Sequence, residues 1–343
     1  MSTQSEPTIE TWIAAQRQSH LPPNEEQLAA FRDLFVTSSP DADGLSQIAT
    51  RIAKPYIKPW DESRVDRLWV IIHSAVEELT SQNDKLVALV LALQRLPDGK
   101  GLRGVPDPFF FDLPGASMYW TEVDNCFSDY SEKDPDRGKN RKAFVNYNTF
   151  LAKLTAQSGD VNILLLQRDR GGRLMRWALE RTPWDENSPT YEPPDGPWVS
   201  DDDSDEDSDE DSAEYSDGDE GDKEEEGVQE EEEDDGVEEE EEEEEDPNYK
   251  ITLLDAIVPA AAQWIKYCPR QMYEMAAAGG EMSNDNHSNF DTKRGYYSLE
   301  RWAYWRNRFE EISTMEMLEE GTRRIAQETM ERMDAMAKEL AKE

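Results

Sequence analysis

The chain has 343 residues and two cysteines, and its 77 acidic and 36 basic residues give a formal net charge of −41 at pH 7. The cysteines, Cys126 and Cys268, are too few for a disulfide framework and too far apart for a CxxC metal or redox site, so we expect reduced thiols and a cytoplasmic or nuclear protein. The sequence has no basic, apolar leader and no run of 18 apolar residues, which predicts neither a secretion signal nor a membrane span.

Helical periodicity dominates residues 8–96. Apolar patterns at 9–13 and 28–35, separated by Pro22 and Pro23, predict a helical hairpin. A brief helix is expected at 45–53, ending at Pro55, and Asp61 can cap the next one. That helix has a one-faced apolar stripe formed by Val65, Leu68, Trp69, Ile72, Ala75, Val76 and Leu79. A further helix starts at Asn83, is apolar all round at 86–93, and ends at Pro97.

The next 90 or so residues are less regular. Residues 97–115 are rich in Gly and Pro, and we expect a loop whose phenylalanines cover the domain surface. Helical patterns resume at 118–130 and 144–154. The following segment, 161–181, is predicted to be interrupted at Gly171 and Gly172, since glycine is a poor helix former.

Beyond residue 250 the chain is helical again. Residues 251–268 form a helix almost without a polar face, and Pro259 predicts a kink or break near Ile257. A polar loop at 284–295 precedes an aromatic helix capped by Ser298, and residues 315–343 form a charged, Met-rich helix. Because no stretch alternates with period two, the predicted fold is all-α.

An acidic tract, residues 201–246, separates the two helical parts. It holds 32 acidic residues, one lysine and no arginine, and it carries −31 of the formal charge. With so few apolar side chains it cannot offset the entropy of ordering, so we expect it to be disordered. Four serines have an acidic residue three positions on and are candidate phosphorylation sites: Ser200, Ser204, Ser208 and Ser216.

The helix at 251–268 must be enclosed by other elements, and the C-terminal part offers it little cover. Its expected partner is the helix at 86–93, with the stripe of 65–79 beside it. This predicts a single discontinuous multi-helix domain, interrupted by the acidic insertion. The expected divisions are N-terminal helices at 1–59, the domain's first part at 60–184, the insertion at 185–249, the second part at 250–312 and the terminal helix at 313–343.

Several segments together suggest a family. These are LWVIIHSAVEEL, DKLVALVLALQRLP, FFFDLPG, NYNTFLAKLTA, RWALE, LLDAIVPAAAQWIKYC and RWAYWRNRFEEI. In order and aromatic spacing they resemble a fungal family of uncharacterised helical proteins, a domain of unknown function, from about Trp60 to Ile312. The resemblance implies an all-helical fold and a fungal source, and it brings no activity or site residues. The acidic insertion departs from the family in its length and its acidity.

Each candidate catalytic or metal motif lacks the sequence context that its function requires. Gly99, Gly101 and Gly104 spell GxGxxG, but a helix precedes them and Pro106 follows, so an inter-helix turn is the better interpretation. The sequence has no GxSxG elbow around Ser117. His20, His73 and His287 are too far apart for a zinc motif, and the polar loop holding Asp285, His287 and Asp291 lacks the calcium-loop pattern. We expect His73 to be a boundary or satisfied core residue, and we expect no cofactor.

Two basic clusters are candidate phosphate contacts, although solvated positions are the preferred interpretation. They are Lys133, Arg137, Lys139, Arg141 and Lys142, and then Arg168, Arg170, Arg173 and Arg176. Because the rest of the chain is also net acidic, we expect no direct binding of nucleic acid.

The favoured function is a non-enzymatic scaffold whose acidic tract binds basic proteins. The alternatives are an insertion that only solubilises, and a small-molecule binder or enzyme with a pocket lined by residues such as Phe127, Trp302 and Trp305. Aromatic residues at helical spacing are more often core. The candidate basic-partner residues are Asp201, Asp202, Asp203, Glu231, Glu232, Glu233, Glu241, Glu242 and Glu243. The sequence does not indicate an oligomeric state.

Overall fold

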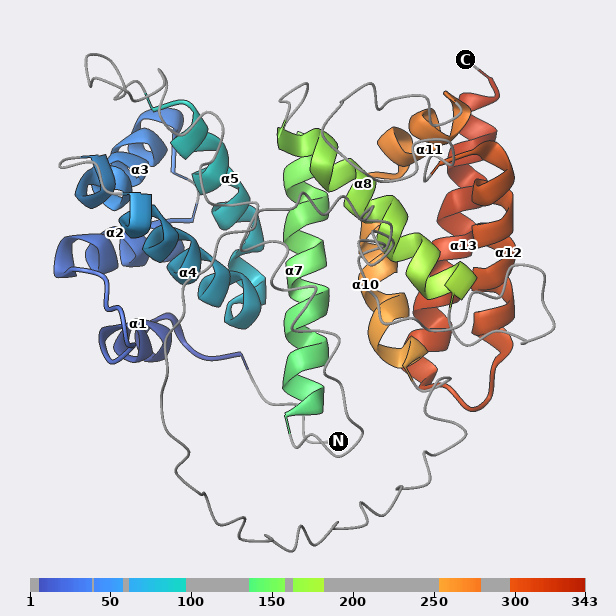
Figure 1. Ribbon diagram of the computed structural model, residues 1–343, viewed down its shortest axis with the longest axis horizontal. Coiled ribbons are helices and arrows are strands. Elements are labelled where there is room, and N and C mark those ends of the chain that lie inside the picture. Colours follow the sequence, from blue (N-terminus) through green and yellow to red (C-terminus); the bar gives the residue numbers. More distant parts are fainter. Residues whose placement is uncertain are drawn as a thin grey trace, which may run out of the picture.

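The computed structural model describes residues 6–38, 40–57, 62–96, 136–157, 163–181, 253–278 and 297–342, and the regular elements in these ranges are all helical (Figure 1). They are α1 (Ile9–Arg17), α2 (Glu25–Val36), α3 (Ala42–Ile57), α4 (Glu62–Glu78), the short 3₁₀ helix η1 (Thr80–Gln82), α5 (Asn83–Gln94), α7 (Arg137–Gln157), α8 (Ile163–Arg176), the π-helix η2 (Trp177–Arg181), α10 (Leu254–Tyr267), α11 (Pro269–Ala277), α12 (Leu299–Thr314) and α13 (Glu320–Leu340). The all-α prediction is confirmed. No helix in these ranges is long and apolar enough to cross a membrane. The acidic tract, the loop at 97–115, the helix expected at 118–130 and the cap at Asp61 lie outside the described residues.

The predicted N-terminal hairpin is confirmed by α1 and α2. Asn24 and Gln27 form a reciprocal capping box at the start of α2, which satisfies two backbone amides. Trp12 on α1 packs edge-on against Phe31 and Phe35 on α2, with ring centroids 5.8 and 5.6 Å apart. The aromatic contact therefore joins the two helices across the proline turn.

α3 is longer than predicted and continues through Pro55 to Ile57. Proline removes one backbone hydrogen bond, but here it does so in the last turn. Tyr56 is 4% exposed, and its hydroxyl oxygen accepts a hydrogen bond of 2.9 Å from Gln27 Nε2. Burial and this side-chain bond hold the turn that the proline weakens.

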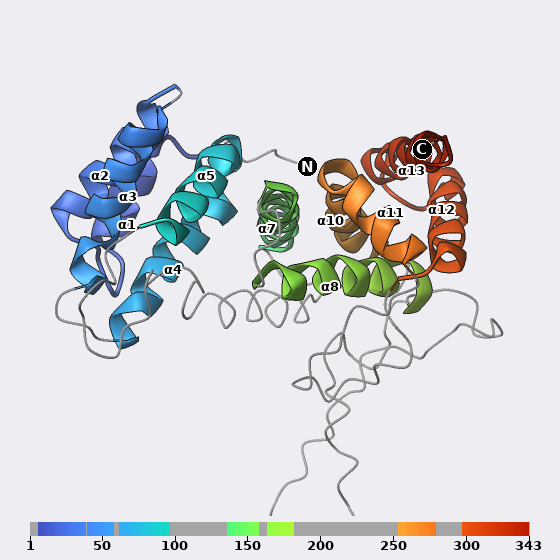
Figure 2. The same ribbon diagram turned by 90° about the horizontal axis from the view of Figure 1, so that it is seen from above.

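The centre of the fold is α7, which lies between two groups of helices (Figures 1 and 2). α4 and α5 pack against one side of it, α10 packs against the other, and α8 crosses below α7 and α10 in Figure 2. Ten of the twelve residues from Phe144 to Thr155 are buried. α7 therefore contributes to the core on both sides.

The structure corrects the expected partner of α10. This helix packs mainly on α7 and α13, and α5 lies on the far side of α7. The reason is that α7 has buried residues toward both groups, and that α13 contributes more cover than its charged sequence suggested, through residues such as Ala326 and Met333. The single discontinuous domain is nevertheless confirmed, because α10 follows the acidic tract and packs on α7, which precedes it.

α10 is continuous through Pro259, so the predicted break does not occur. Pro259 lies in the second turn, where only the bond to the Asp255 carbonyl is lost. Nine residues of α10 are buried, among them Ile257 and Trp264. The prediction that this helix is enclosed is correct for most of its described residues, although Lys266 is exposed and Asp255 and Gln263 are partly buried.

α8 also runs unbroken through Gly171 and Gly172, against the prediction of an interruption. A Cβ on Gly171 would lie 2.8 Å from Trp264 Cε3 and 3.3 Å from the Tyr297 hydroxyl. The missing side chain lets α8 approach the indole of α10 closely. This glycine is therefore a packing residue within a helix.

The C-terminal helices complete the domain. Ser298 caps α12 as predicted, accepting a hydrogen bond of 3.0 Å from Arg301 N. The terminal helix begins at Glu320 and not at Met315, and the Asp255 carboxylate of α10 accepts a hydrogen bond of 3.0 Å from Glu319 N. Asp255 thus ties the start of α13 to α10.

Candidate functional site

A group of mostly buried polar side chains, His73, Glu77, Tyr147 and Arg170, lies where α4, α7 and α8 meet; we call it the polar cluster. His73 Nδ1 lies 3.4 Å from Glu77 Oε1, one turn along α4. The Tyr147 ring centroid is 4.9 Å from that of the imidazole and 5.2 Å from Arg170 Cζ. Tyr147 and Arg170 are only 1% and 4% exposed. The fold therefore gathers titratable groups from three segments in its interior.

Burial shifts the protonation of these groups. It lowers the pKa of His73 to about 4, assisted by the charge of Arg170. It also raises the pKa of Glu77 to about 7, assisted by Glu78 and opposed by Lys139, although 38% of the Glu77 side chain still reaches solvent. Burial and then Glu77 raise the pKa of Tyr147. At neutral pH the imidazole is neutral, and Glu77 is poised to take up or release a proton.

Two atoms of the polar cluster are buried without a hydrogen-bond partner among the described residues: His73 Nε2 and Tyr147 Oη. The amide nitrogens nearby are paired, since Asn146 Nδ2 donates to the Glu77 carbonyl at 2.8 Å and Asn83 Nδ2 donates to the Asn146 carbonyl at 3.2 Å, whereas Asn83 Oδ1 is also buried without a partner among the described residues. Folded proteins leave few buried polar atoms unpaired. The polar cluster combines unpaired buried atoms with shifted pKa values and can therefore bind protons. Across the described ranges, no group of three or more His, Cys, Asp or Glu residues is placed to hold a metal ion.

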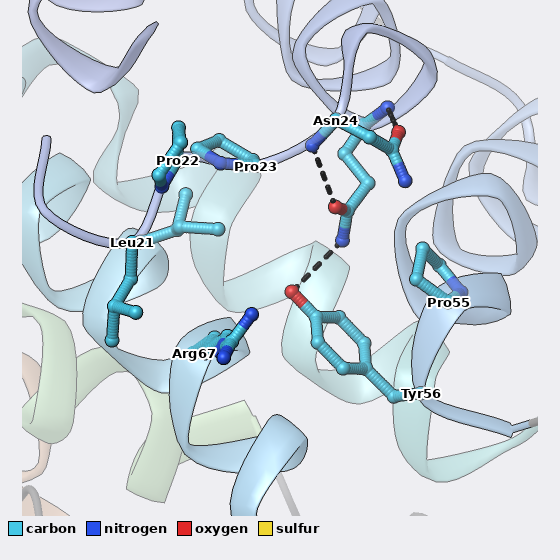
Figure 3. A pocket seen from close by; sticks show the side chains of 9 residues that line it. Leu21, Pro22, Pro23, Asn24, Pro55, Tyr56 and Arg67 are labelled. Atoms are coloured by element: carbon cyan, nitrogen blue, oxygen red, sulfur yellow. Dashed lines mark hydrogen bonds between the residues drawn. The ribbon is translucent and has the colours of Figure 1, made fainter. Parts of the chain in front are cut away.

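A pocket of about 170 Å³ opens between α2, α3 and the first turns of α4 (Figure 3). Its apolar walls include Leu21, Pro22, Pro23 and Ile71, and its polar groups include Tyr56 and Arg67. We call it the Arg67 pocket. Figure 3 shows the Arg67 guanidinium beside the Tyr56 hydroxyl. A pocket this small is suited to a ligand of a few heavy atoms, since drug-sized sites are typically about 300 Å³ or larger.

The members of the two basic clusters differ in their exposure and in their partners. Arg137, Lys139, Arg141 and Lys142 lie in the first turns of α7, with Lys139 and Lys142 exposed and Arg141 3.5 Å from Glu319. The interpretation of the second cluster as solvated is wrong for Arg170, because its guanidinium is buried over the Tyr147 ring. Arg173 and Arg176 are partly buried, while Lys133 and the side chain of Arg168 lie outside the described residues.

The aromatic residues considered for a ligand pocket are core residues where they are described. Trp302 and Trp305 are 4% and 0% exposed, and the Trp305 indole donates a hydrogen bond of 2.6 Å to the Glu180 carboxylate of η2. Phe127 lies outside the described residues. The acidic and serine candidates of the tract, the GxGxxG glycines and the loop with Asp285, His287 and Asp291 also lie outside them.

Sequence reasoning missed Glu77 and Tyr147, and it named Arg170 only as a candidate phosphate contact. The one local signal was the spacing of His73 and Glu77, four residues apart on the edge of an apolar stripe. We expected His73 to be a boundary or satisfied core residue; its side chain is 18% exposed, which agrees with a boundary position, but its Nε2 has no partner among the described residues. Tyr147 and Arg170 belong to other helices, and their meeting with α4 depends on the tertiary fold. The free, buried Cys268, in contrast, agrees with the expected reduced state.

Comparison with known proteins places the chain in a family without a known activity. No curated protein and no solved structure matches it. The model of a family described as a protein of unknown function, DUF3632, matches residues 69–309. This range contains the polar cluster, α7 and α10 and both ends of the acidic tract. The fungal source implied by the resemblance stays a prediction. The predicted membership of a domain family of unknown function is confirmed: the chain belongs to the DUF3632 family of proteins of unknown function.

Proposed function

We propose that the protein is a non-enzymatic helical scaffold whose acidic tract binds basic proteins, in the cytoplasm or the nucleus. One observation supports this proposal: the tract carries −31 of the formal charge and is inserted between η2 and α10, two elements that pack against each other. A partner that neutralises the tract need not disturb the helical contacts. The helices would present the tract, and the tract would supply the attraction.

The mechanism is long-range electrostatic attraction. The nine acidic candidates at 201–203, 231–233 and 241–243 sample the whole length of the tract and would contact lysine and arginine side chains of the partner. Phosphorylation of Ser200, Ser204, Ser208 or Ser216 adds negative charge and would strengthen binding. The attraction is screened by salt, because the Debye length falls from about 10 Å at 0.1 M to about 3 Å at 1 M.

The test compares the full chain with a variant of equal length in which the acidic residues of 201–246 are replaced by Asn and Gln. Core histones are used as the basic probe at about 50 mM and about 0.5 M salt. We expect the unmodified chain to bind at low salt only, and the variant to bind at neither. Equal binding by the variant would place the interaction elsewhere. Absence of binding by the unmodified chain would leave the tract a solubilising insertion and refute the proposal.

A further inference from the structure

The Arg67 pocket contains a hydrogen-bond donor that the protein does not use. Gln27 Nε2 has two hydrogens and donates them to the Ile52 carbonyl at 3.0 Å and to Tyr56 Oη at 2.9 Å (Figure 3). Gln27 Oε1 accepts from Asn24 N at 3.2 Å, which fixes the orientation of the amide. Tyr56 Oη is therefore an acceptor toward Gln27. Its own hydrogen has no acceptor among the described residues.

Arg67 is a second unused donor at the same place. Its side chain is exposed and makes no ion pair or hydrogen bond within the described ranges. The guanidinium acts electrostatically on Tyr56: burial raises the pKa of Tyr56, while the Gln27 hydrogen bond and the charge of Arg67 oppose this. A cation and a neutral O–H donor thus line the same pocket, an arrangement that suits a carboxylate.

Two neighbouring cations among the described residues, Arg17 and Lys54, are already paired, which limits the charge that the ligand can carry. Arg17 bonds Glu25 at 2.8 Å, and Lys54 bonds Glu26 at 3.2 Å. The N-terminus of α2 is closed by its capping box. A phosphate dianion would need a second free cation or free backbone amides, whereas one arginine and one hydroxyl match a monoanion.

The apolar walls define the rest of the ligand. Leu21 is 39% exposed, and it lines the pocket together with Pro22 and Ile71. An engineered apolar cavity of about 150 Å³ binds benzene, so about 170 Å³ has room for a ring or a branched chain of similar size.

We propose that the Arg67 pocket binds a small monocarboxylic acid with a branched or aromatic tail. The carboxylate accepts hydrogen bonds from the Arg67 guanidinium and the Tyr56 hydroxyl, and the tail packs on Leu21, Pro22 and Ile71. The site lies in the N-terminal helices and is independent of the acidic tract.

The test is calorimetric titration of the full chain with 3-methylbutanoate, its neutral amide, acetate and inorganic phosphate. We expect 3-methylbutanoate to bind, and the amide and acetate to bind at least about tenfold more weakly, because each lacks one of the two kinds of contact. Phosphate is expected to give no signal. Failure of 3-methylbutanoate to bind, or tighter binding of phosphate, would overturn the proposal.

Substitutions in the Arg67 pocket test whether the acid binds there. Arg67→Gln should weaken 3-methylbutanoate at least about tenfold, and Tyr56→Phe several-fold, with folding checked by circular dichroism. Arg17→Gln is the matched control, since it removes a neighbouring charge that is already paired, and it should leave affinity unchanged. An equal loss of affinity in Arg17→Gln and Arg67→Gln would mean that only the net charge of the protein matters, and it would refute the site. Tighter binding of a peptide ending in Leu than of the free acid would assign the pocket to a chain terminus and likewise refute it.

Discussion

The buried polar groups on the two sides of α7 differ in whether they are hydrogen-bonded. Toward α10, Asn148 Oδ1 accepts from the Trp264 indole at 3.1 Å, Asn148 Nδ2 donates to the Phe144 carbonyl at 3.0 Å, and Cys268 Sγ donates to the Ala152 carbonyl at 2.7 Å. Toward α4, the neighbouring residue Tyr147 keeps an unpaired hydroxyl beside His73. Adjacent positions on one helix thus face a paired and an unpaired environment.

The α10 side of α7 is mainly structural, whereas the α4 side holds groups that can change their protonation. The α10 side closes the discontinuous domain, and there an unpaired polar atom would weaken a main contact between the segments that the acidic tract separates in sequence. The α4 side joins segments before the tract and holds the groups with shifted pKa values. Stability should therefore depend strongly on the α10 side and weakly on the unpaired atoms of the α4 side.

The largest expected effect is that of Ile257→Asp. Ile257 is 0% exposed on α10, and burial of an unpaired carboxylate costs several kcal/mol, a large part of the usual 5–15 kcal/mol of domain stability. Because the halves form one domain, denaturant unfolding followed by tryptophan fluorescence and by circular dichroism should shift together. Ile257→Val, which removes one methylene group, should cost only about 0.5–1.5 kcal/mol. Two separate transitions would show that the halves are independent.

A smaller loss is expected for Gly171→Ala, although alanine favours helices by about 1 kcal/mol over glycine. The new Cβ would lie 2.8 Å from the buried Trp264 ring, which cannot move without disturbing α10. Overpacking of this kind typically costs about 1–3 kcal/mol. Gly138→Ala is the matched control, because nothing lies within 4 Å of a Cβ at that position of α7. Thermal melts should show the first variant destabilised and the second unchanged or stabilised; stabilisation of both would contradict the close approach of α8 and α10.

The same contrast explains what the sequence could predict. All seven residues of the stripe from Val65 to Leu79 are buried, because the period of a helix shows which face it buries whatever covers it. The partner of α10 was predicted wrongly, since an apolar face does not specify which other apolar face it meets. Arg170 and Gly171 were misread for a related reason: a charge normally reads as exposed and a glycine as a helix break, and only the tertiary contacts with Tyr147 and Trp264 reverse this.

The polar cluster should make the stability of the fold depend on pH. In the folded protein His73 has a pKa of about 4, against an ordinary 6.5, so the unfolded state binds more protons between these values and stability rises with pH. Glu77 has a folded pKa of about 7, against 4.5, so the folded state binds more protons and stability falls as pH rises between these values. The two slopes oppose each other and largely cancel between pH 4.5 and 6.5.

Single variants should remove this cancellation. Relative to the unmodified protein, Glu77→Gln should gain stability as pH rises from 4.5 to 6.5, and His73→Gln should lose stability over the same range. Urea unfolding at pH 4.5, 5.5 and 6.5 measures both slopes, and the double variant should return to the unmodified profile. Parallel profiles for both single variants would show that neither group is shifted by the fold.

The smallest effect is expected for Tyr147→Phe, and it tests the unpaired side of α7 directly. Tyr147 and Tyr56 are both buried, at 1% and 4% exposed, so the same substitution removes one buried hydroxyl at each position. The Tyr56 hydroxyl accepts from Gln27 Nε2, which is itself buried, and its removal leaves that amide hydrogen unpaired at a cost of about 1–3 kcal/mol. The Tyr147 hydroxyl has no partner among the described residues, so its removal relieves a desolvation penalty and should be neutral or slightly stabilising. Urea denaturation of the two variants side by side makes the comparison, and a loss at Tyr147 as large as that at Tyr56 would mean that the Tyr147 hydroxyl is hydrogen-bonded in solution.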